Sequence, residues 1–457
     1  MKAKKKKDNI YVFRSFRDTV VRMMHAQDTT LFQLNGIPRL KQAFPLAIQH
    51  VVAMIVGCVT PALIIASSTH LSSADSILLV QGSLVIAAVS TFLQLFPPFS
   101  WLGSGLPVML GVSFAYLPSM QAIAQGYDLA TIFGAELVGG VVAVLVGVFV
   151  KKLRVLFPPL ITGTVVFTIG LSLYPTAINY MAGGTGSPLY GSWQNWLVSI
   201  VTLAVVTVFN HYGKGIWKLA SILIGIIVGY ILAIPFGLVN FSPVGSAGLF
   251  ALPIPMHFGI KFEISSCFAL GILFAINSIQ AIGDFTATTV GGMDRQPTDK
   301  ELQSGIICYG VSNMLGACFG GLPTATYSQN VGIVTTTKVI NRFTLGLGAG
   351  ILLLAGLLPK FSAMLTTIPQ CVLGGATVTV FASIAMTGMK LVVSQPMNYR
   401  NTSIVGLAAA LGMGISQSSA AVASFPQWFQ IIFAKSPVVI ATLVAVTLQI
   451  LLPGKES

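Results

Sequence analysis

The feature that most constrains this chain is the scarcity of charge over very long stretches. No lysine or arginine occurs between Gln42 and Val150, and only 8% of all residues are charged whereas 54% are hydrophobic. Soluble globular domains carry about 25% charged residues, so this composition excludes a soluble enzyme, a coiled coil and a disordered chain. The sequence therefore predicts an all-α polytopic membrane protein, with the lipid bilayer as its surroundings.

Fourteen apolar segments are expected to cross the membrane. The last is the least regular, because Pro426 and Pro437 interrupt that region. Residues 1–44 precede the first segment as a polar, basic arm, either an interfacial amphipathic helix or a solvated tail. The expected segments are 45–67, 76–96, 106–126, 131–149, 157–178, 194–209, 217–238, 264–284, 303–319, 322–338, 342–358, 368–389, 401–417 and 437–452.

The distribution of positive charge predicts how the chain is oriented. With the arm placed in the cytoplasm, 22 of the 25 lysines and arginines fall on the cytoplasmic side, and only Lys261, Lys360 and Lys435 fall outside. Cytoplasmic loops of membrane proteins carry such an excess. We therefore expect a multi-pass protein of the plasma membrane with a cytoplasmic N-terminus, and we attribute the net charge of +13 to topology rather than to nucleic-acid binding.

The residue patterns of hydrolytic and metal-dependent chemistry are missing from the sequence. It holds no Ser/His/Asp grouping, no metal-ligand spacing and no phosphate-binding loop. Its five cysteines form no CxxC pair and all lie in apolar segments, where we expect them to pack in the core. No enzymatic activity, ATP-driven pumping, metal or cofactor is therefore expected.

An even number of segments suggests an internal repeat. Fourteen divides into two sets of seven, and an odd number per set forces the second set to insert upside down, as in many secondary transporters. Gly105-Leu106-Pro107 opens the third segment, and Gly321-Leu322-Pro323 opens the tenth, its counterpart in the second set. This echo is weak, but it lies where the symmetry requires it.

Segments three and ten are predicted to be interrupted helices. Pro107 and Pro118 lie in the third segment, and Gly320, Gly321 and Pro323 begin the tenth. Broken backbone at membrane depth is tolerated only inside protein or beside a water-filled cavity, and paired breaks point to a midplane binding site. The start of a half-helix also offers N–H groups to a ligand carbonyl. The alternative is that these glycines only allow close helix packing.

Few polar side chains lie deep in the segments. His50 lies in the first, Gln280 and Asp284 share one face of the eighth, and Gln329 with Asn330 mark the break in the tenth. Ionisable groups inside a membrane are costly, so they are functional candidates by default. The alternatives are a hydrogen bond between helices for His50 and a position at the inner interface for Asp284.

These residues resemble the signature of the xanthine/uracil permease family, also called nucleobase-ascorbate transporters. Gln329-Asn330-Val331-Gly332-Ile333-Val334-Thr335-Thr336-Thr337-Lys338 fits the family pattern (Gln/Glu/Pro)-Asn-x-Gly-x(4)-Thr-(Arg/Lys/Gly) at every specified position. Supporting matches are Gln49-His50, Ser113-Phe114-Ala115 and Gly283-Asp284. The resemblance spans residues 45–452.

The resemblance implies a 7+7 inverted-repeat fold with short strands in segments three and ten. It divides the chain into a core domain (45–150 and 263–358) and a gate domain (151–262 and 359–457), which move against each other as an elevator, usually in homodimers. It also implies a nucleobase site between segments three, eight and ten. The implied substrate-binding residues are Gln329, Gln280, Phe114, Ser113, Ala115, Ser328 and Asn330, with His50 and Asp284 coupling transport or supporting the site.

The chemistry of these side chains suits such a ligand. A nucleobase edge alternates N–H donors and C=O acceptors, which a carboxamide answers with one donor and one acceptor. Gln329 and Gln280 can each do this, and Phe114 can cover a ring face, although in the family a backbone N–H can make the contact in segment three. Gln rather than Glu at position 329 resembles the purine-type members, which favours an oxidised purine such as xanthine or urate.

Two departures from the family bear on ion coupling. The family commonly has a Glu where Gln280 stands, and often an acidic residue in segment nine, where this chain reads Cys308-Tyr309-Gly310. Asp284 and His50 then remain as candidates to carry a coupling proton, since Glu136, near the outer end of segment four, is expected to be interfacial. Proton symport is implied by the family but weakened here, and sodium coupling or uncoupled transport stays open.

Other functions remain open on the sequence alone. Within the class, the alternatives are a permease for uracil or another nucleobase and an anion transporter of the sulfate-permease type, against which the complete Gln-Asn-x-Gly motif argues. Outside it, the alternative is a channel or a membrane receptor. Saturable uptake with counterflow distinguishes a transporter from the ohmic conductance of a channel.

Overall fold

The computed structural model describes residues 30–153, 158–426, 429–430 and 436–452, so most of the predicted basic arm lies outside the described residues. The arm is also shorter than predicted, because the first long helix begins at Leu40 rather than near Pro45. Lys41 and Gln42 lie in the first turn of this helix, whereas Ala43 and Ala47 are already buried in the core. The helix therefore starts within the polar residues and carries them as its first turn.

Two sets of elements follow the same order along the chain. Each begins with two long helices, continues through a strand with a short helix, and is completed by further helices. The first set is α2 (Leu40–Ser68), α3 (Ser73–Leu95), β1 (Leu110–Val112) with η2 (Phe114–Tyr116) and α4 (Leu117–Ala124), α5 (Leu129–Val148), α7 (Pro159–Ser172) with α8 (Tyr174–Met181), α9 (Trp193–Tyr212), and α10 (Ile216–Leu219) with α11 (Ser221–Ala233).

The second set repeats this order and confirms the 7+7 arrangement. Short elements at η1 (Thr30–Phe32), α6 (Val150–Leu153), α12 (Ser242–Ser246) and η4 (Ser419–Val422) lie outside the repeated pattern. The second set is α13 (Ile264–Met293), α14 (Asp299–Phe319), β2 (Thr324–Thr326) with α15 (Ser328–Thr337), α16 (Arg342–Gly356) with α17 (Pro359–Thr366), α18 (Gln370–Val393), α19 (Tyr399–Gln417) and α21 (Pro437–Leu451).

Not every predicted segment is a continuous apolar helix. Within the described residues, seven helices are long and apolar enough to cross a bilayer, and α16 with α17, bent by 79°, makes an eighth if the pair is one span. The remaining segments are the two strand-containing elements, the short apolar helices α11 and α21, and the more polar α14 and α19. α14 tolerates its polarity because it packs against α3 and α5 inside the protein.

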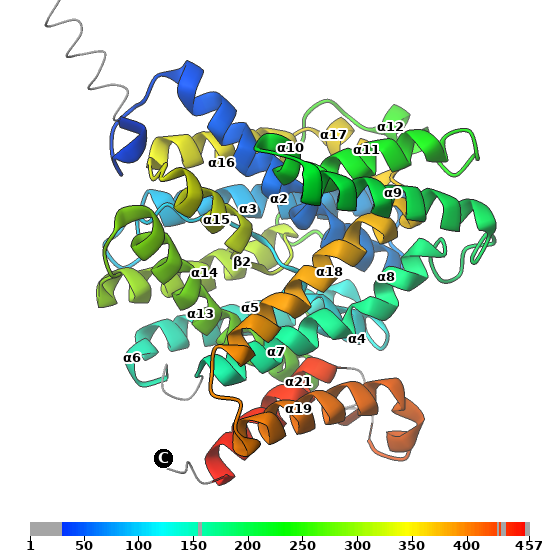
Figure 1. The fold of residues 1–457 in the computed structure, drawn as a ribbon. Coiled ribbons are helices and arrows are strands. Elements are labelled where there is room, and N and C mark those ends of the chain that lie inside the picture. Colours follow the sequence, from blue (N-terminus) through cyan, green and yellow to red (C-terminus); the bar gives the residue numbers. More distant parts are fainter. Residues whose placement is uncertain (1–29, 154–157, 427–428, 431–435, 453–457) are drawn as a thin grey trace, which may run out of the picture.

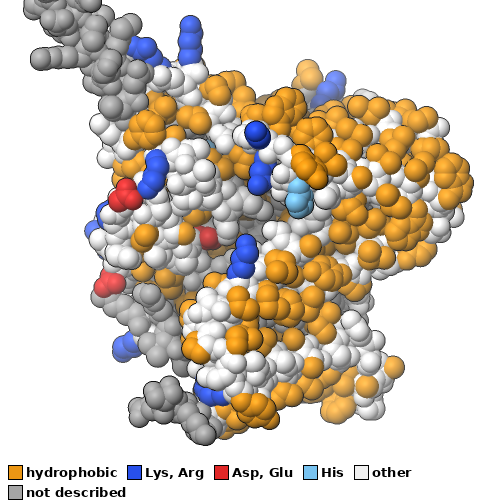
Figure 2. All heavy atoms as spheres, viewed as in Figure 1, with side chains coloured by type: hydrophobic (Ala, Val, Ile, Leu, Met, Phe, Trp, Pro, Cys, Tyr) orange, Lys and Arg blue, Asp and Glu red, His pale blue; other side chains and the backbone are white. Residues whose placement is uncertain are grey.

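The helices pack into two groups. α5 lies against α13 and α14, and α3 lies against α14 and α16, whereas α18 lies against α7, α8 and α9, and α19 pairs with α21. Figure 1 shows the first group on one side of the molecule and α7, α9, α11 and α18 on the other. A broad hydrophobic surface covers α9 and α11 in Figure 2, as expected for helices that face lipid; it exposes Trp193, Ile200, Val208, Ile227 and Ile231.

The two broken segments meet as a pair of antiparallel strands. Leu110 pairs with Thr326 and Val112 with Thr324, so each strand supplies backbone partners to the other at the centre of the protein. This confirms the strands predicted in segments three and ten. Positive φ angles occur just before both strands, at Gly105 (66°) and at Gly320 (71°). The turn glycine of the tenth segment is therefore Gly320, one residue before the Gly-Leu-Pro echo.

The cysteines pack as predicted. Cys58, Cys308 and Cys371 are buried, Cys267 and Cys318 are partly buried, and all five are free thiols. They contribute to packing rather than to covalent cross-linking.

Candidate functional site

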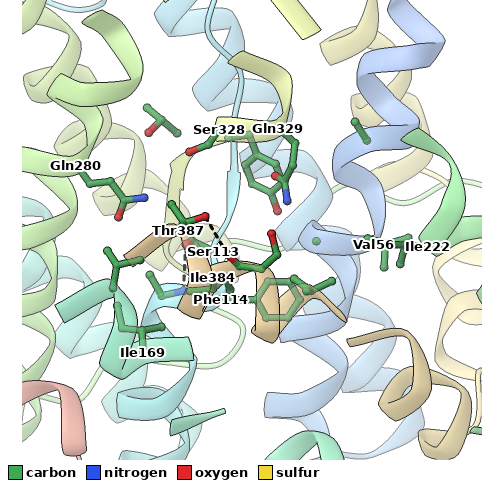
Figure 3. Close-up of a pocket in the computed structure, with 18 of the residues that line it drawn as sticks. Val56, Ser113, Phe114, Ile169, Ile222, Gln280, Ser328, Gln329, Ile384 and Thr387 are labelled. Atoms are coloured by element: carbon green, nitrogen blue, oxygen red, sulfur yellow. Dashed lines mark hydrogen bonds between the residues drawn. The ribbon is translucent and has the colours of Figure 1, made fainter. Parts of the chain in front are cut away.

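A cavity of about 320 Å³ lies where the strand pair meets α2, α13 and α18. This volume suits a small organic ligand. Six of the seven residues predicted to bind substrate line it: Ser113, Phe114, Ala115, Gln280, Ser328 and Gln329. Figure 3 shows five of them, all but Ala115, around this space. The structure thus brings together residues from segments three, eight and ten. The rest of the lining is Val52, Ala53, Val56, Gly57, Val166, Ile169, Leu219, Ile222, Thr326, Tyr327, Val380, Ser383, Ile384 and Thr387.

The first broken segment supplies three consecutive lining residues. β1 ends at Val112, and the Ser113 hydroxyl accepts a hydrogen bond from the Ala115 N–H at 3.2 Å, which caps the short helix η2. The Phe114 ring packs edge-on against Phe381 of α18, with the ring centroids 5.3 Å apart. Phe114 is therefore held between the strand and α18, where it can cover one face of a flat ligand.

The second broken segment is anchored by Tyr327. Its hydroxyl donates a hydrogen bond to the Val112 carbonyl at 2.6 Å, which ties the end of β2 to the end of β1. α2 passes so close that a Cβ added to Gly57 would lie 2.6 Å from this hydroxyl oxygen. Only glycine at position 57 lets α2 reach the strand ends and form part of the cavity wall.

Asp284 fixes the hydroxyl groups on both sides of the second break. Its carboxylate accepts hydrogen bonds from Thr326 Oγ1 at 2.5 Å and from Ser328 Oγ at 2.8 Å. Thr326 ends β2 and Ser328 begins α15. Asp284 is buried and does not itself line the cavity, so it acts behind the cavity wall. Its geometry is that of a group that positions the two hydroxyls.

Asn330, predicted to bind substrate, lies outside the cavity lining and faces α2 instead. Its amide nitrogen donates to His50 Nδ1 and to the His50 carbonyl, both at 3.1 Å, and both residues are buried. Successive residues of a helix point about 100° apart, so when Gln329 faces the cavity its neighbour turns away. His50 therefore forms a hydrogen bond between helices, which was the alternative to a functional role for this residue.

The carboxamides of Gln280 and Gln329 extend into the cavity from α13 and α15 (Figure 3). Within the described part of the chain, neither side chain has a hydrogen-bond partner, and both are at least partly accessible. Each amide keeps one donor and one acceptor direction available. Gln329 also lies in the first turn of α15, where the backbone N–H groups have no partners within the helix.

The sequence did not predict the opposite side of the cavity. α7 contributes Val166 and Ile169, α11 contributes Ile222, and α18 contributes Val380 and Ile384. Aliphatic residues of this kind fill every segment, so nothing in their pattern marks them. The one available signal is the spacing of Ser383 and Thr387, four residues apart on one face of segment twelve, and both line the cavity.

The position of Glu136 also differs from the prediction. It was predicted to be interfacial, but its exposed fraction is 0% and both carboxyl oxygens lack a hydrogen-bond partner among the described residues. The reason is that α5 already begins at Leu129, capped by Asp128, which places Glu136 about 10 Å along the helix axis. Its side chain lies inside the first group of helices and away from the cavity lining.

The cavity lining contains no lysine, arginine, aspartate or glutamate among the residues described. Its polarity comes from amides, hydroxyls and helix N-termini, which suit a polar ligand with hydrogen-bonding edges. Two inverted sets of segments with such a cavity at their crossing strands define a membrane transporter. The sequence profile of the xanthine and uracil permeases, described as the permease family, matches residues 41–421, so the chain belongs to this family.

Individual relatives and solved structures agree with this assignment. Uric acid permease PucJ of Bacillus subtilis (strain 168) is 36% identical over 393 residues, covering 84% of this chain and 87% of its own length. Xanthine permease XanQ of Escherichia coli (strain K12) is 30% identical over 453 residues, covering 94% and 95%. The transmembrane domain of a cyanobacterial bicarbonate transporter, BicA, is similar in fold, with a TM-score of 0.53 at 15% identity over 91% of this chain and 98% of its own. SLC26A9 has a TM-score of 0.60 at 10% identity over 90% and 66%.

Proposed function

We propose that this protein is a nucleobase permease of the plasma membrane that carries an oxidised purine such as xanthine or urate. The observation that carries the proposal is the pair of unpartnered carboxamides, Gln280 and Gln329, which converge on an uncharged cavity. The names of the relatives, a uric acid permease and a xanthine permease, support the choice of a purine. The anion transporters share the fold only, at 10–15% identity.

The purine binds with its ring edge toward the two amides. Gln329 and Gln280 each pair with one N–H or C=O group of the ring. The N–H groups at the start of α15 face a ring carbonyl, and the hydroxyl of Ser328, held by Asp284, adds a further polar contact. Phe114 covers a ring face. His50 and Asn330 hold α2 and α15 together behind this arrangement.

Transport follows the division into a core domain (45–150 and 263–358) and a gate domain (151–262 and 359–457). The packing of α2, α3, α5, α13, α14 and α16 apart from α7, α8, α9 and α18 supports this division. The cavity is lined from both groups, so sliding of one past the other carries a bound ligand across as an elevator. The excess of lysine and arginine in alternate loops supports a cytoplasmic N-terminus, and the family resemblance favours a homodimer.

The family resemblance implies that transport is coupled to protons. The alternatives are coupling to the Na⁺ gradient and uncoupled transport down the gradient of the purine itself. A disulfide between cysteines introduced on facing positions of α7 and α13 should stop transport while purine binding persists. Full transport in a protein shown to be cross-linked contradicts the elevator.

The decisive experiment is reconstitution in proteoliposomes with radiolabelled xanthine. We expect saturable uptake and counterflow, competed by urate and less well by adenine or uracil, with accumulation tested under imposed proton and sodium gradients. Strong competition by uracil alone would redirect the assignment to a uracil permease. Ohmic conductance without counterflow, or no saturable flux of any nucleobase, overturns the proposal.

A further inference from the structure

Glu136 is a buried acidic group for which the proposed binding site has no use. It lies on α5 with an exposed fraction of 0%, and neither carboxyl oxygen has a hydrogen-bond partner among the residues the structure describes. A carboxylate left unpaired in a protein interior costs several kcal/mol, far more than the neutral acid. In the conformation described here, Glu136 therefore holds its proton.

The Glu136 side chain points toward α14, because a Cβ added to Gly316 of that helix would lie 3.3 Å from Glu136 Oε1. Tyr116 of η2 and Tyr309 of α14 share its electrostatic environment. The Tyr116 and Tyr309 hydroxyls are hydrogen-bonded to each other, and both residues are buried. A carboxylate formed beside this pair can accept a hydrogen bond from either hydroxyl once their mutual bond opens.

Other charged and titratable groups lie elsewhere on the elements packed against α5. They do not replace the tyrosines as partners. On α13, Asp284 is occupied by Thr326 and Ser328; at the start of α5, Asp128 pairs with Lys261; at the start of α14, Glu301 pairs with Arg295. The other groups on these elements, among the side chains described, are Cys267 on α13, Asp299, Lys300 and Cys308 on α14, and Lys152 on α6.

The tyrosine pair connects Glu136 to both broken segments. Tyr116 follows directly after Phe114 and Ala115, which line the cavity. On the other side, the Tyr309 carbonyl accepts a hydrogen bond from the Asn313 amide at 2.8 Å, and Asn313 Oδ1 accepts one from the Thr324 N–H of β2 at 2.6 Å. The tyrosine pair thus connects the short helix that follows β1 with the helix α14 that holds the start of β2.

We propose that Glu136 is a proton-exchange site of the transport cycle, coupled to the cavity through Tyr116, Tyr309 and Asn313. The inference rests on the proposed function of a purine permease and adds a proton carrier to it. In the neutral state, the tyrosines bond each other and the strand ends have the geometry described above. On ionisation, the O–H bond of the acid breaks, its proton passes to water, and a tyrosine hydroxyl turns toward the carboxylate.

The proposal fixes the direction of the pH effect. Purine binding favours the protonated state, so the affinity for xanthine falls as the pH rises through the titration of Glu136. We expect a fall of about tenfold between roughly pH 5 and 8, within the usual range of coupling between two sites. The variant Glu136→Gln imitates the neutral acid, so it should lack the part of the fall that is due to Glu136 and keep a xanthine affinity close to that of the native protein at low pH.

The test measures binding of radiolabelled xanthine to the purified full-length protein across this pH range. Asp128→Asn is the matched control, because it removes a carboxylate from the start of the same helix while asparagine keeps the cap; it should follow the native pH profile. Any titration of xanthine itself is common to all three proteins. A native pH dependence that survives in Glu136→Gln, or a native affinity that does not change with pH, overturns the proposal.

Infrared spectroscopy supplies a readout that does not depend on transport. The native protein should show the carbonyl band of a protonated carboxylic acid, absent from Glu136→Gln, that disappears at high pH and changes when xanthine binds. If Glu136→Gln does not fold, Tyr309→Phe should fold and flatten the pH profile. If this band does not change on xanthine binding while the binding itself is normal, the coupling between Glu136 and the cavity is overturned. Absence of binding to every purine overturns the proposed function, and the pH titration of the band then decides whether Glu136 exchanges its proton.

Discussion

The two sides of the cavity differ in chemistry and in how firmly they are held. The polar wall consists of Ser113, Gln280, Thr326, Ser328 and Gln329, on the strand ends and on α13 and α15. The aliphatic wall consists of Val166, Ile169, Ile222, Val380 and Ile384, on α7, α11 and α18. Hydrogen bonds to Asp284 and between the strands organise the first wall. The five aliphatic side chains of the second can offer a ligand only van der Waals contact, beside the Ser383 and Thr387 hydroxyls of the same side.

This difference separates recognition from movement. Directional hydrogen bonds discriminate between bases, and they stay intact if the ligand moves together with the wall that makes them. An aliphatic surface has no directional bonds to break, so a ligand can leave it for another such surface at a small cost in free energy. The comparison predicts that substitutions in the polar wall change affinity and preference strongly, whereas those in the aliphatic wall change affinity little.

The largest effect is expected for Gln329→Ala. Truncation leaves polar groups of the purine without partners, at about 1–3 kcal/mol, so affinity for xanthine should fall by about 100-fold. Equilibrium binding to the purified protein measures this. Gln395→Ala removes a partly exposed amide from a loop outside the cavity lining and should bind normally. Unchanged affinity in Gln329→Ala removes segment ten from the site.

Asp284→Asn should have the next largest effect. The amide retains a single acceptor oxygen for two hydroxyls, so Thr326 or Ser328 loses its fixed orientation. We expect about a tenfold loss of affinity with normal expression, the size of one weakened hydrogen-bond network. The control is Asp294→Asn, at the exposed end of the same helix. Equal losses in both variants contradict a positioning role for Asp284.

Gln280→Glu tests the preference of the polar wall. The exchange removes an amide donor and introduces a second acceptor that titrates, so ligands that present an N–H at this edge should gain and those that present a carbonyl should lose. We expect some binding to persist, with a pH profile that differs from the native one and a reordered competition series among xanthine, urate and hypoxanthine. A variant with native affinity, pH profile and ligand order places residue 280 outside contact with the ligand.

The smallest effect is expected for Ser383→Ala, opposite the polar wall. Ser383 is exposed to the cavity, and the Thr387 hydroxyl already donates to its carbonyl at 2.8 Å. Removing the Ser383 hydroxyl should change xanthine affinity by less than about threefold, as for a weak or absent hydrogen bond. Ser113→Ala supplies the comparison in the polar wall. A larger loss at Ser383 than at Ser113 contradicts the division between the walls.

Four of the five residues of the polar wall, all but Thr326, could be singled out from the sequence because they are chemically unusual for their surroundings or fit the family pattern. Gln280 and Gln329 stand out as amides in apolar segments, and the glycines and prolines near them mark the breaks. The prediction that Asn330 faces the ligand was wrong for a geometric reason. Whether the residue after Gln329 faces ligand or protein depends on where α15 begins, and that was only visible once Ser328 was seen to start the helix.

The aliphatic wall and Glu136 were beyond the reach of such reasoning. Ile169 and Val380 have the same chemistry as residues that face lipid, so only the packing of α7 and α18 distinguishes them. The depth of Glu136 depends on a helix start two residues earlier than the apolar run suggests, and on which face of α5 contacts α14. Both are properties of packing rather than of local pattern.

The pairing of β1 with β2 has a consequence for biosynthesis. Because the two strands come from opposite halves of the chain, the Met109 carbonyl and the Ser113 N–H, which flank β1, find their partners at Tyr327 and Pro323 only after the second half has been synthesised and inserted. Until then the first half carries open backbone inside the bilayer, where unpaired amides are costly. We expect chains that stop before Leu322 to be recognised as incomplete and degraded, and co-expression of the two halves to rescue the first.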